Sequence, residues 1–204
     1  ATDRSASEAS WIASQAEALS ISATPNKARK RAAAQKSPQV PGTGSPKIPI
    51  LLVQYTDKKM SNTKEDFETI YSKSAKSAKQ YFVDQSRGKF SPQFDLYGIY
   101  TLSSNRATYG GNDYNGNDKG VAKMVGEACQ LAEKEGINWE DYDNDGDGEC
   151  DVVIVVYAGV GEAQAYGVVP NAVWPCQWQL SDAKIYGDGP GKLTLDGVDI
   201  DKFA

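Results

Sequence analysis

The sequence contains no histidine among its 204 residues. Histidine is the commonest metal ligand and the side chain most often used as a general base near neutral pH. The chain therefore cannot build a metal site on imidazole groups or activate a nucleophile with histidine. A nucleophilic hydrolase that uses Cys176 or a serine is disfavoured for the same reason.

Cysteine is scarce, and long apolar runs are missing. Cys129, Cys150 and Cys176 are too few and too irregularly spaced for a zinc ribbon. They allow one disulfide with one thiol left over, and the sequence does not determine the pairing. No apolar run approaches the roughly 20 residues that a membrane-spanning helix needs. No signal peptide is visible, so we expect that the signal of an exported protein has already been removed.

Charge is distributed unevenly along a chain whose net charge is −5. This negative balance argues against nucleic acid as the main partner. Residues 18–56 contain no acid, and KARKR occupies residues 27–31. Residues 1–46 are rich in Ala, Ser, Lys and Pro, with a weak helical pattern from Ser7 to Leu19. We predict that they form an N-terminal extension, either a protease-accessible linker or the remnant of a pro-segment.

Residues 47–204 have the pattern of an α/β domain. The apolar runs at residues 48–55 and 152–159 predict buried strands, and the alternating stretch 94–102 predicts a half-buried strand. Asn62 and Glu65 have capping-box spacing and predict a helix over residues 62–72, with a second helix over residues 74–92. The clearest helix is predicted over residues 118–136, with one apolar face made of Val121, Met124, Val125, Ala128, Leu131 and Ala132.

The stretch DNDGDGECD, residues 143–151, places acids at alternate positions directly before a predicted strand. The carboxylates of Asp143, Asp145 and Asp147 fall at positions 1, 3 and 5 of a calcium loop, with Gly148 at the sharp turn. The backbone carbonyl of Glu149 and the carboxylate of Asp151 complete the predicted ligand set. Position 12 is not the glutamate that an EF-hand requires, and a strand follows instead of a helix. The alternatives are a solvated acidic turn and a Mg²⁺ site, but Mg²⁺ prefers fewer carboxylates and more waters.

Several segments occur in an order that resembles a known family. They are IPILLVQYTDKKM, YFVDQSRGKFSPQFDLYG, YGGNDYNGND, INWEDYDNDGDGECDVVIVVYAGVGEA and VWPCQW. Together they resemble the start of the catalytic domain of secreted bacterial metalloproteases related to immune inhibitor A, over residues 48–204. The resemblance implies an α/β zincin-like portion with a twisted mixed sheet and a long backing helix. It also implies structural calcium, a zinc held by an HExxH helix, and protein or peptide substrates.

The HExxH segment of that family has no counterpart in this sequence, and the resemblance places it after residue 204. We therefore expect the chain to be a non-catalytic part of a secreted, cell-surface or periplasmic zinc endopeptidase. The remaining C-terminal part of the catalytic domain would then supply the zinc ligands. The alternative is a calcium-binding module for binding or adhesion that never had catalytic residues.

Three further side chains follow the predicted strand at residues 152–159. Glu162 is interpreted either as a residue at the edge of a substrate cleft or as a solvated loop carboxylate. Trp174 and Trp178 flank Pro175 and Cys176. We interpret these two tryptophans as a packed corner rather than as a wall on which substrate stacks.

Overall fold

Three parallel strands form the centre of the computed structural model, which describes residues 39–114, 116–165, 168–169 and 171–204. The strand order is β2 (Gln93–Thr101), β1 (Lys47–Gln54) and β3 (Ile154–Tyr157). The six residues from Ile48 to Val53 are all buried. A parallel strand covered on both faces needs such a continuous apolar run, so the predicted buried strand is confirmed.

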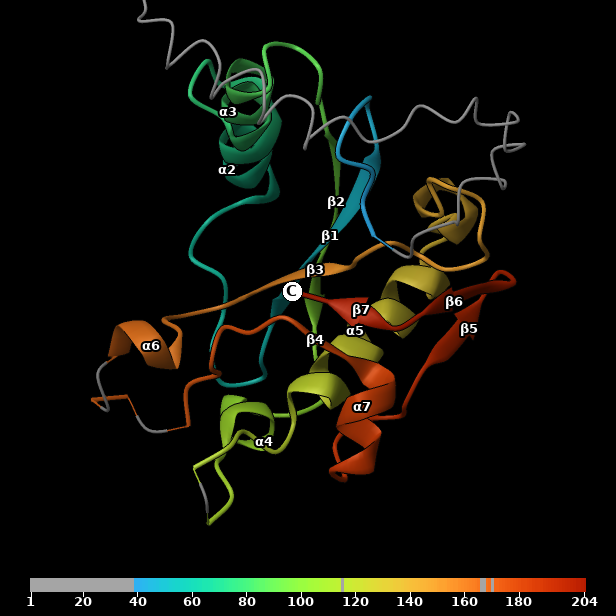
Figure 1. Ribbon diagram of the computed structural model, residues 1–204. Coiled ribbons are helices and arrows are strands. Elements are labelled where there is room, and N and C mark those ends of the chain that lie inside the picture. Colours follow the sequence, from blue (N-terminus) through green and yellow to red (C-terminus); the bar gives the residue numbers. More distant parts are fainter. Residues whose placement is uncertain (1–38, 115, 166–167, 170) are drawn as a thin grey trace, which may run out of the picture. The chain divides into compact units, whose positions relative to one another are not determined.

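One face of the sheet packs against α5 (Val121–Lys134), as Figure 1 shows. Leu51 and Val53 point to this side and share a core with the buried face of the helix. The apolar residues of α5 recur with helical spacing, so most of them reach the same core. The long backing helix is confirmed at its predicted place.

The opposite face of the sheet is covered by short helices. Ile50 and Leu52 pack there with Phe67 and Tyr71, from α2 (Lys64–Glu68) and the π-helix η1 (Thr69–Lys73). The capping box is formed by Thr63 and Asp66, one residue later than the predicted pair Asn62 and Glu65. The following helix α3 (Ala78–Gln85) is shorter than predicted, because Ser77 caps its N-terminus and Gly88 adopts a left-handed conformation after its end.

The C-terminal residues return to the edge of the sheet beside β3. The Val153 N–H donates to the Lys202 carbonyl at 3.0 Å, and the Val155 N–H donates to the Ala204 carbonyl at 2.9 Å. This places β7 (Lys202–Phe203) parallel to β3, while β4 (Trp178–Gln179) pairs with β7 in the antiparallel direction. The expected α/β class with mixed pairing is confirmed.

Short elements complete the described fold. The hairpin strands β5 (Leu193–Leu195) and β6 (Val198–Ile200) pair with each other. The remaining elements are α4 (Arg106–Gly110), the 3-10 helix η2 (Trp139–Tyr142), α6 (Glu162–Ala165) and α7 (Leu180–Ile185). Within the residues that the structure describes, no helix has the length and apolar character needed to cross a membrane.

Backbone hydrogen bonds that join the chain before Lys47 to the rest of the domain are found at Gly44. The Gly44 N–H donates to the Lys89 carbonyl, and the Gly44 carbonyl accepts from the Ser91 N–H, both at 2.8 Å. The predicted helix from Ser7 to Leu19 and the basic run at residues 27–31 lie outside the described residues. The extension over residues 1–46 therefore stays a prediction.

Candidate functional site

The acidic loop lies between η2 and β3. Gly146 and Gly148 both adopt left-handed backbone conformations, with φ angles of 70° and 90°. Glycine takes these angles without the steric cost that a Cβ atom would impose. The expected sharp turn at Gly148 is confirmed, and a second turn at Gly146 accompanies it.

Hydrogen bonds between carboxylates and backbone hold the loop in a tight curl. Asp143 accepts from the N–H groups of Asp147 and Gly148, both at 2.9 Å. The Asp147 N–H also donates to Asp145 at 3.1 Å, and Asp147 in turn accepts from the Glu149 N–H at 2.9 Å. These bonds turn the alternate carboxylates toward one another and offset part of their mutual repulsion.

Three of the five predicted ligands come together. Asp143, Asp145 and Asp147 each offer a carboxylate oxygen, and these oxygens all lie within 4.8 Å of one another. The Glu149 side chain points elsewhere, because it forms an ion pair with Lys192 at 2.6 Å. The predicted ligand is the backbone carbonyl of Glu149, and this ion pair of the side chain does not involve it.

Asp151 lies outside that group of three but close to it. Asp151 is 2% exposed, and its Oδ1 atom is buried without a hydrogen-bond partner among the described residues. Burial raises the pKa of the Asp151 carboxyl, the Asn144 hydrogen bond opposes the shift, and the charges of Asp145, Asp147 and Asp143 add to it. A cation in the loop would reduce this repulsion.

Asn144 holds the loop in place through hydrogen bonds that its position in the sequence does not predict. Its Nδ2 group donates to the Asp151 carboxylate at 2.7 Å and to the Lys47 carbonyl at 3.0 Å. Its Oδ1 atom accepts from the Lys47 N–H at 2.8 Å. Asn144 thus connects the acidic loop to the first residue of β1, which lies 97 positions earlier in the sequence.

Oxygen ligands at alternate positions suit a hard cation such as Ca²⁺. The orphaned Asp151 oxygen and the convergence of Asp143, Asp145 and Asp147 agree with such an ion. Within the described part of the chain, this is the one group of three acidic or thiol side chains that converge closely enough to hold a metal. The residues present therefore fit calcium.

The residues present do not fit a catalytic zinc. The chain has no histidine, and its cysteines lie in separate segments, with Cys129 in α5, Cys150 before β3 and Cys176 before β4. Zinc binds the thiolate form of cysteine. Burial raises the pKa of the Cys129 and Cys176 thiols, and it raises that of Cys150 to about 12, so all three are held in the neutral form.

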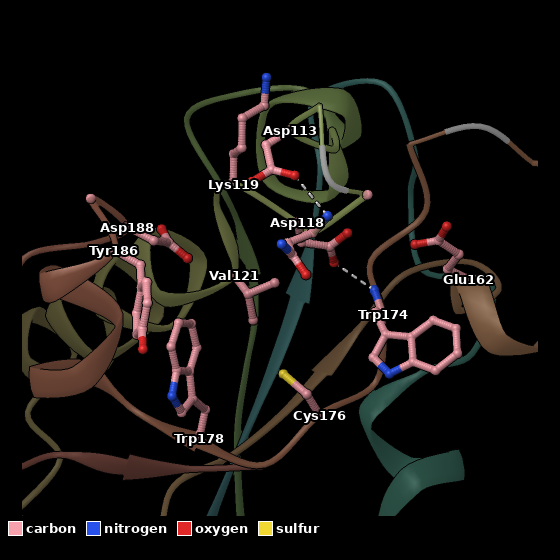
Figure 2. A pocket seen from close by; sticks show the side chains of 13 residues that line it. Asp113, Asp118, Lys119, Val121, Glu162, Trp174, Cys176, Trp178, Tyr186 and Asp188 are labelled. Carbon is pink, nitrogen blue, oxygen red and sulfur yellow. Dashed lines mark hydrogen bonds between the residues drawn. The ribbon is translucent and has the colours of Figure 1, made fainter.

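A separate cavity of about 1100 Å³ lies among the loops that follow β3 and α4 (Figure 2). Its wall includes Glu162, Trp174, Cys176 and Trp178. Trp174 is 53% exposed, so the packed-corner interpretation is wrong for this side chain. Trp178 is half-buried and packs against Tyr186, with ring centroids 5.9 Å apart. Glu162 lines the cavity, which agrees with its placement at a cleft edge.

Comparison with known proteins gives a consistent result. The family model described as "Immune inhibitor A peptidase M6, catalytic domain" matches residues 51–202. The Pre-pro-metalloprotease PrtV of Vibrio cholerae serotype O1 is 32% identical in a 120-residue alignment that covers 51% of this chain and 13% of that protein. Immune inhibitor A of Bacillus thuringiensis subsp. alesti is 23% identical in a 193-residue alignment that covers 74% of this chain and 27% of that protein. The chain thus spans about a quarter or less of the length of these relatives.

Proposed function

This chain belongs to the immune inhibitor A peptidase family M6, and we propose that it is part of the catalytic domain of a secreted zinc-dependent endopeptidase. The reaction would be the hydrolysis of peptide bonds in protein substrates. The observation that carries the proposal is the match of the catalytic-domain model to residues 51–202. Metalloprotease relatives that align with the same chain support it.

The acidic loop has a structural role in this proposal. Ca²⁺ would be held by the carboxylates of Asp143, Asp145, Asp147 and Asp151 and by the Glu149 carbonyl. Bound there, the ion supplies positive charge that offsets the repulsion among these carboxylates. The loop lies between η2 and β3, and Asn144 bonds it to Lys47. Calcium would therefore stabilise the junction between the central sheet and the segment that follows α5.

The zinc ligands would come from another part of the protein. No residue of this chain can replace the two histidines of an HExxH helix, because histidine is absent from all 204 residues. We propose that the rest of the catalytic domain supplies the zinc site and the reacting groups. This chain would then contribute the calcium loop, the central sheet and part of the substrate-binding surface.

Export from the cytoplasm is part of the same proposal. A calcium loop outside the cell typically has a dissociation constant on the order of 10⁻⁴ to 10⁻³ M and is filled only where calcium is abundant. The word "Pre-pro" in the name of the Vibrio relative describes a precursor and agrees with export of that protein. We propose a secreted, cell-surface or periplasmic location.

The proteolytic function is tested by comparing two polypeptides. The 204-residue chain is expected not to cleave casein, because it lacks histidine ligands for zinc. The product of the complete reading frame that encodes it is expected to contain HExxH and to cleave casein. This cleavage should stop on addition of 1,10-phenanthroline and return with zinc.

Two results would contradict the proposal. The first is a complete reading frame without HExxH whose product leaves casein intact in the presence of zinc and calcium. That result would favour a calcium-binding module for binding or adhesion. The second is chelator-sensitive proteolysis by the 204-residue chain itself.

A further inference from the structure

The cavity has a wall that is unusually rich in carboxylates. Asp113, Asp118, Glu162 and Asp188 line it, whereas Lys119 is its one basic lining residue in the described structure. Figure 2 shows the Lys119 side chain extending away from the two tryptophans, so that its ammonium group lies far from the middle of the cavity. The electrostatic potential inside the cavity is therefore expected to be negative.

Two of these carboxylates already have structural roles. Asp188 accepts hydrogen bonds from the Ala122 and Lys123 N–H groups at 2.8 and 3.2 Å and thereby caps the N-terminus of α5. Asp113 accepts from the Asn117 N–H at 3.0 Å and closes its own loop. Asp118 keeps one oxygen without a hydrogen-bond partner in the described structure, and Glu162 accepts only a long hydrogen bond from the Asn112 amide at 3.4 Å, so both carboxylates have capacity for a ligand.

Asp118 lies at the centre of the wall in Figure 2. Its Oδ2 atom accepts a hydrogen bond from the backbone N–H of Trp174 at 2.7 Å. Its Oδ1 atom is buried and has no hydrogen-bond partner in the described structure. Burial raises the pKa of the Asp118 carboxyl, the Trp174 hydrogen bond opposes this, and the charges of Glu162 and Asp188 add to it. A cation next to Asp118 would stabilise its ionised form.

Three aromatic side chains, Trp174, Trp178 and Tyr186, also line the cavity. In Figure 2, Trp174 lies on the Glu162 side of the cavity, and Trp178 lies with Tyr186 on the other side. Trp174 is 53% exposed, although a large apolar ring normally gains free energy by burial. Indole faces attract guanidinium and ammonium groups, and tryptophan does so best among the aromatic side chains.

From this arrangement we infer that the cavity binds an arginine or lysine side chain of a peptide. Its volume of about 1100 Å³ exceeds what one side chain needs and leaves room for neighbouring peptide residues. The carboxylates lie around the wall and do not converge, since within the described residues the close metal-type grouping occurs at the acidic loop instead. The cavity thus suits an extended organic cation better than a metal ion.

The identification of this peptide as a substrate rests on the proposed function, but binding does not. Peptide binding is measured on the 204-residue chain without zinc and without hydrolysis. If the arginine peptide binds and the complete protein fails to cleave casein, the cavity assignment stands and the proteolytic function fails. If casein is cleaved but the chain binds a peptide with a charged side chain no more tightly than its uncharged analogue, the proteolytic function stands and this inference fails.

Isothermal titration calorimetry with two capped tripeptides tests the inference. Alanyl-arginyl-alanine is expected to bind at least about ten-fold more tightly than alanyl-citrullyl-alanine, because citrulline has the same shape without the charge. Asp118→Asn and Trp174→Ala are each expected to remove most of this difference. Asp196→Asn, a matched change on an exposed loop away from the cavity, should retain it.

Equal affinity for the two tripeptides, or binding of neither, would overturn the inference. It would also be overturned if the preference for arginine persisted in both cavity variants. The exposed Trp174 provides a variant that is expected to fold normally, so a folding defect in Asp118→Asn would not hide the result.

Discussion

Removing calcium from the 204-residue chain is expected to lower its melting temperature by several degrees. Asp143, Asp145 and Asp147 hold their carboxylate oxygens within 4.8 Å of one another, and Asp151 adds a buried carboxylate beside them. Without an ion these charges repel, and unfolding separates them. A ligand at a hundredfold excess over its dissociation constant stabilises the folded state by roughly 2.7 kcal/mol. For a domain of this size, each kcal/mol corresponds to about 2–4 °C.

Melting curves in calcium and in EGTA measure this difference. Asp145→Ala should abolish most of the calcium-dependent shift, because it removes one of the three convergent carboxylates. Asp141→Ala is the matched control, since its side chain lies outside the ligand register and pairs with Lys47 at 3.2 Å. That pair is partly exposed and contributes about 0–1 kcal/mol, so its loss should lower both curves slightly and leave their separation unchanged. Identical melting temperatures of the wild type in the two buffers would mean that the loop is a solvated turn.

Asn144→Ala is expected to destabilise the calcium-free chain by about 2–4 kcal/mol, because it leaves a buried carboxylate and a backbone N–H without partners. The side chain makes hydrogen bonds to Asp151 and to both backbone groups of Lys47. Alanine can replace none of them. The melting temperature in EGTA should fall by roughly 5–15 °C.

Asn138→Ala serves as the control for this substitution. Asn138 is exposed and makes no side-chain capping hydrogen bond at the start of η2, so its replacement should change the melting temperature by little. Equal effects of the two substitutions would contradict the role assigned to Asn144. Urea denaturation in EGTA provides the free energies of unfolding for the comparison.

The sequence predicted the elements whose residues repeat with a clear period. The buried strand β1, the helix α5 and the turn at Gly148 are found where composition and spacing placed them. These features depend on local chemistry, namely apolar periodicity and the conformational freedom of glycine. The family resemblance is confirmed by the match over residues 51–202.

Features that depend on distant contacts could not be predicted in this way. Asp188 caps α5 from 66 residues away, and Asn144 bonds to the start of β1 across 97 positions. The cavity is assembled from separate segments that carry Asp118, Glu162 and Trp174. Its negative wall is not visible in any single stretch of sequence. Within α3, the ability of Ser77 to cap a helix overrode the longer pattern that predicted a helix from residue 74.

We propose that this chain is the calcium-binding part of a metallopeptidase domain and holds no zinc of its own. Metal analysis of the purified 204-residue chain, dialysed against equal concentrations of calcium and zinc, tests it most directly. We predict about one calcium per chain and no stoichiometric zinc, with the calcium lost in Asp145→Ala and retained in Asp141→Ala. One tightly bound zinc per chain, or a calcium content that Asp145→Ala leaves unchanged, would contradict this assignment of the metal site.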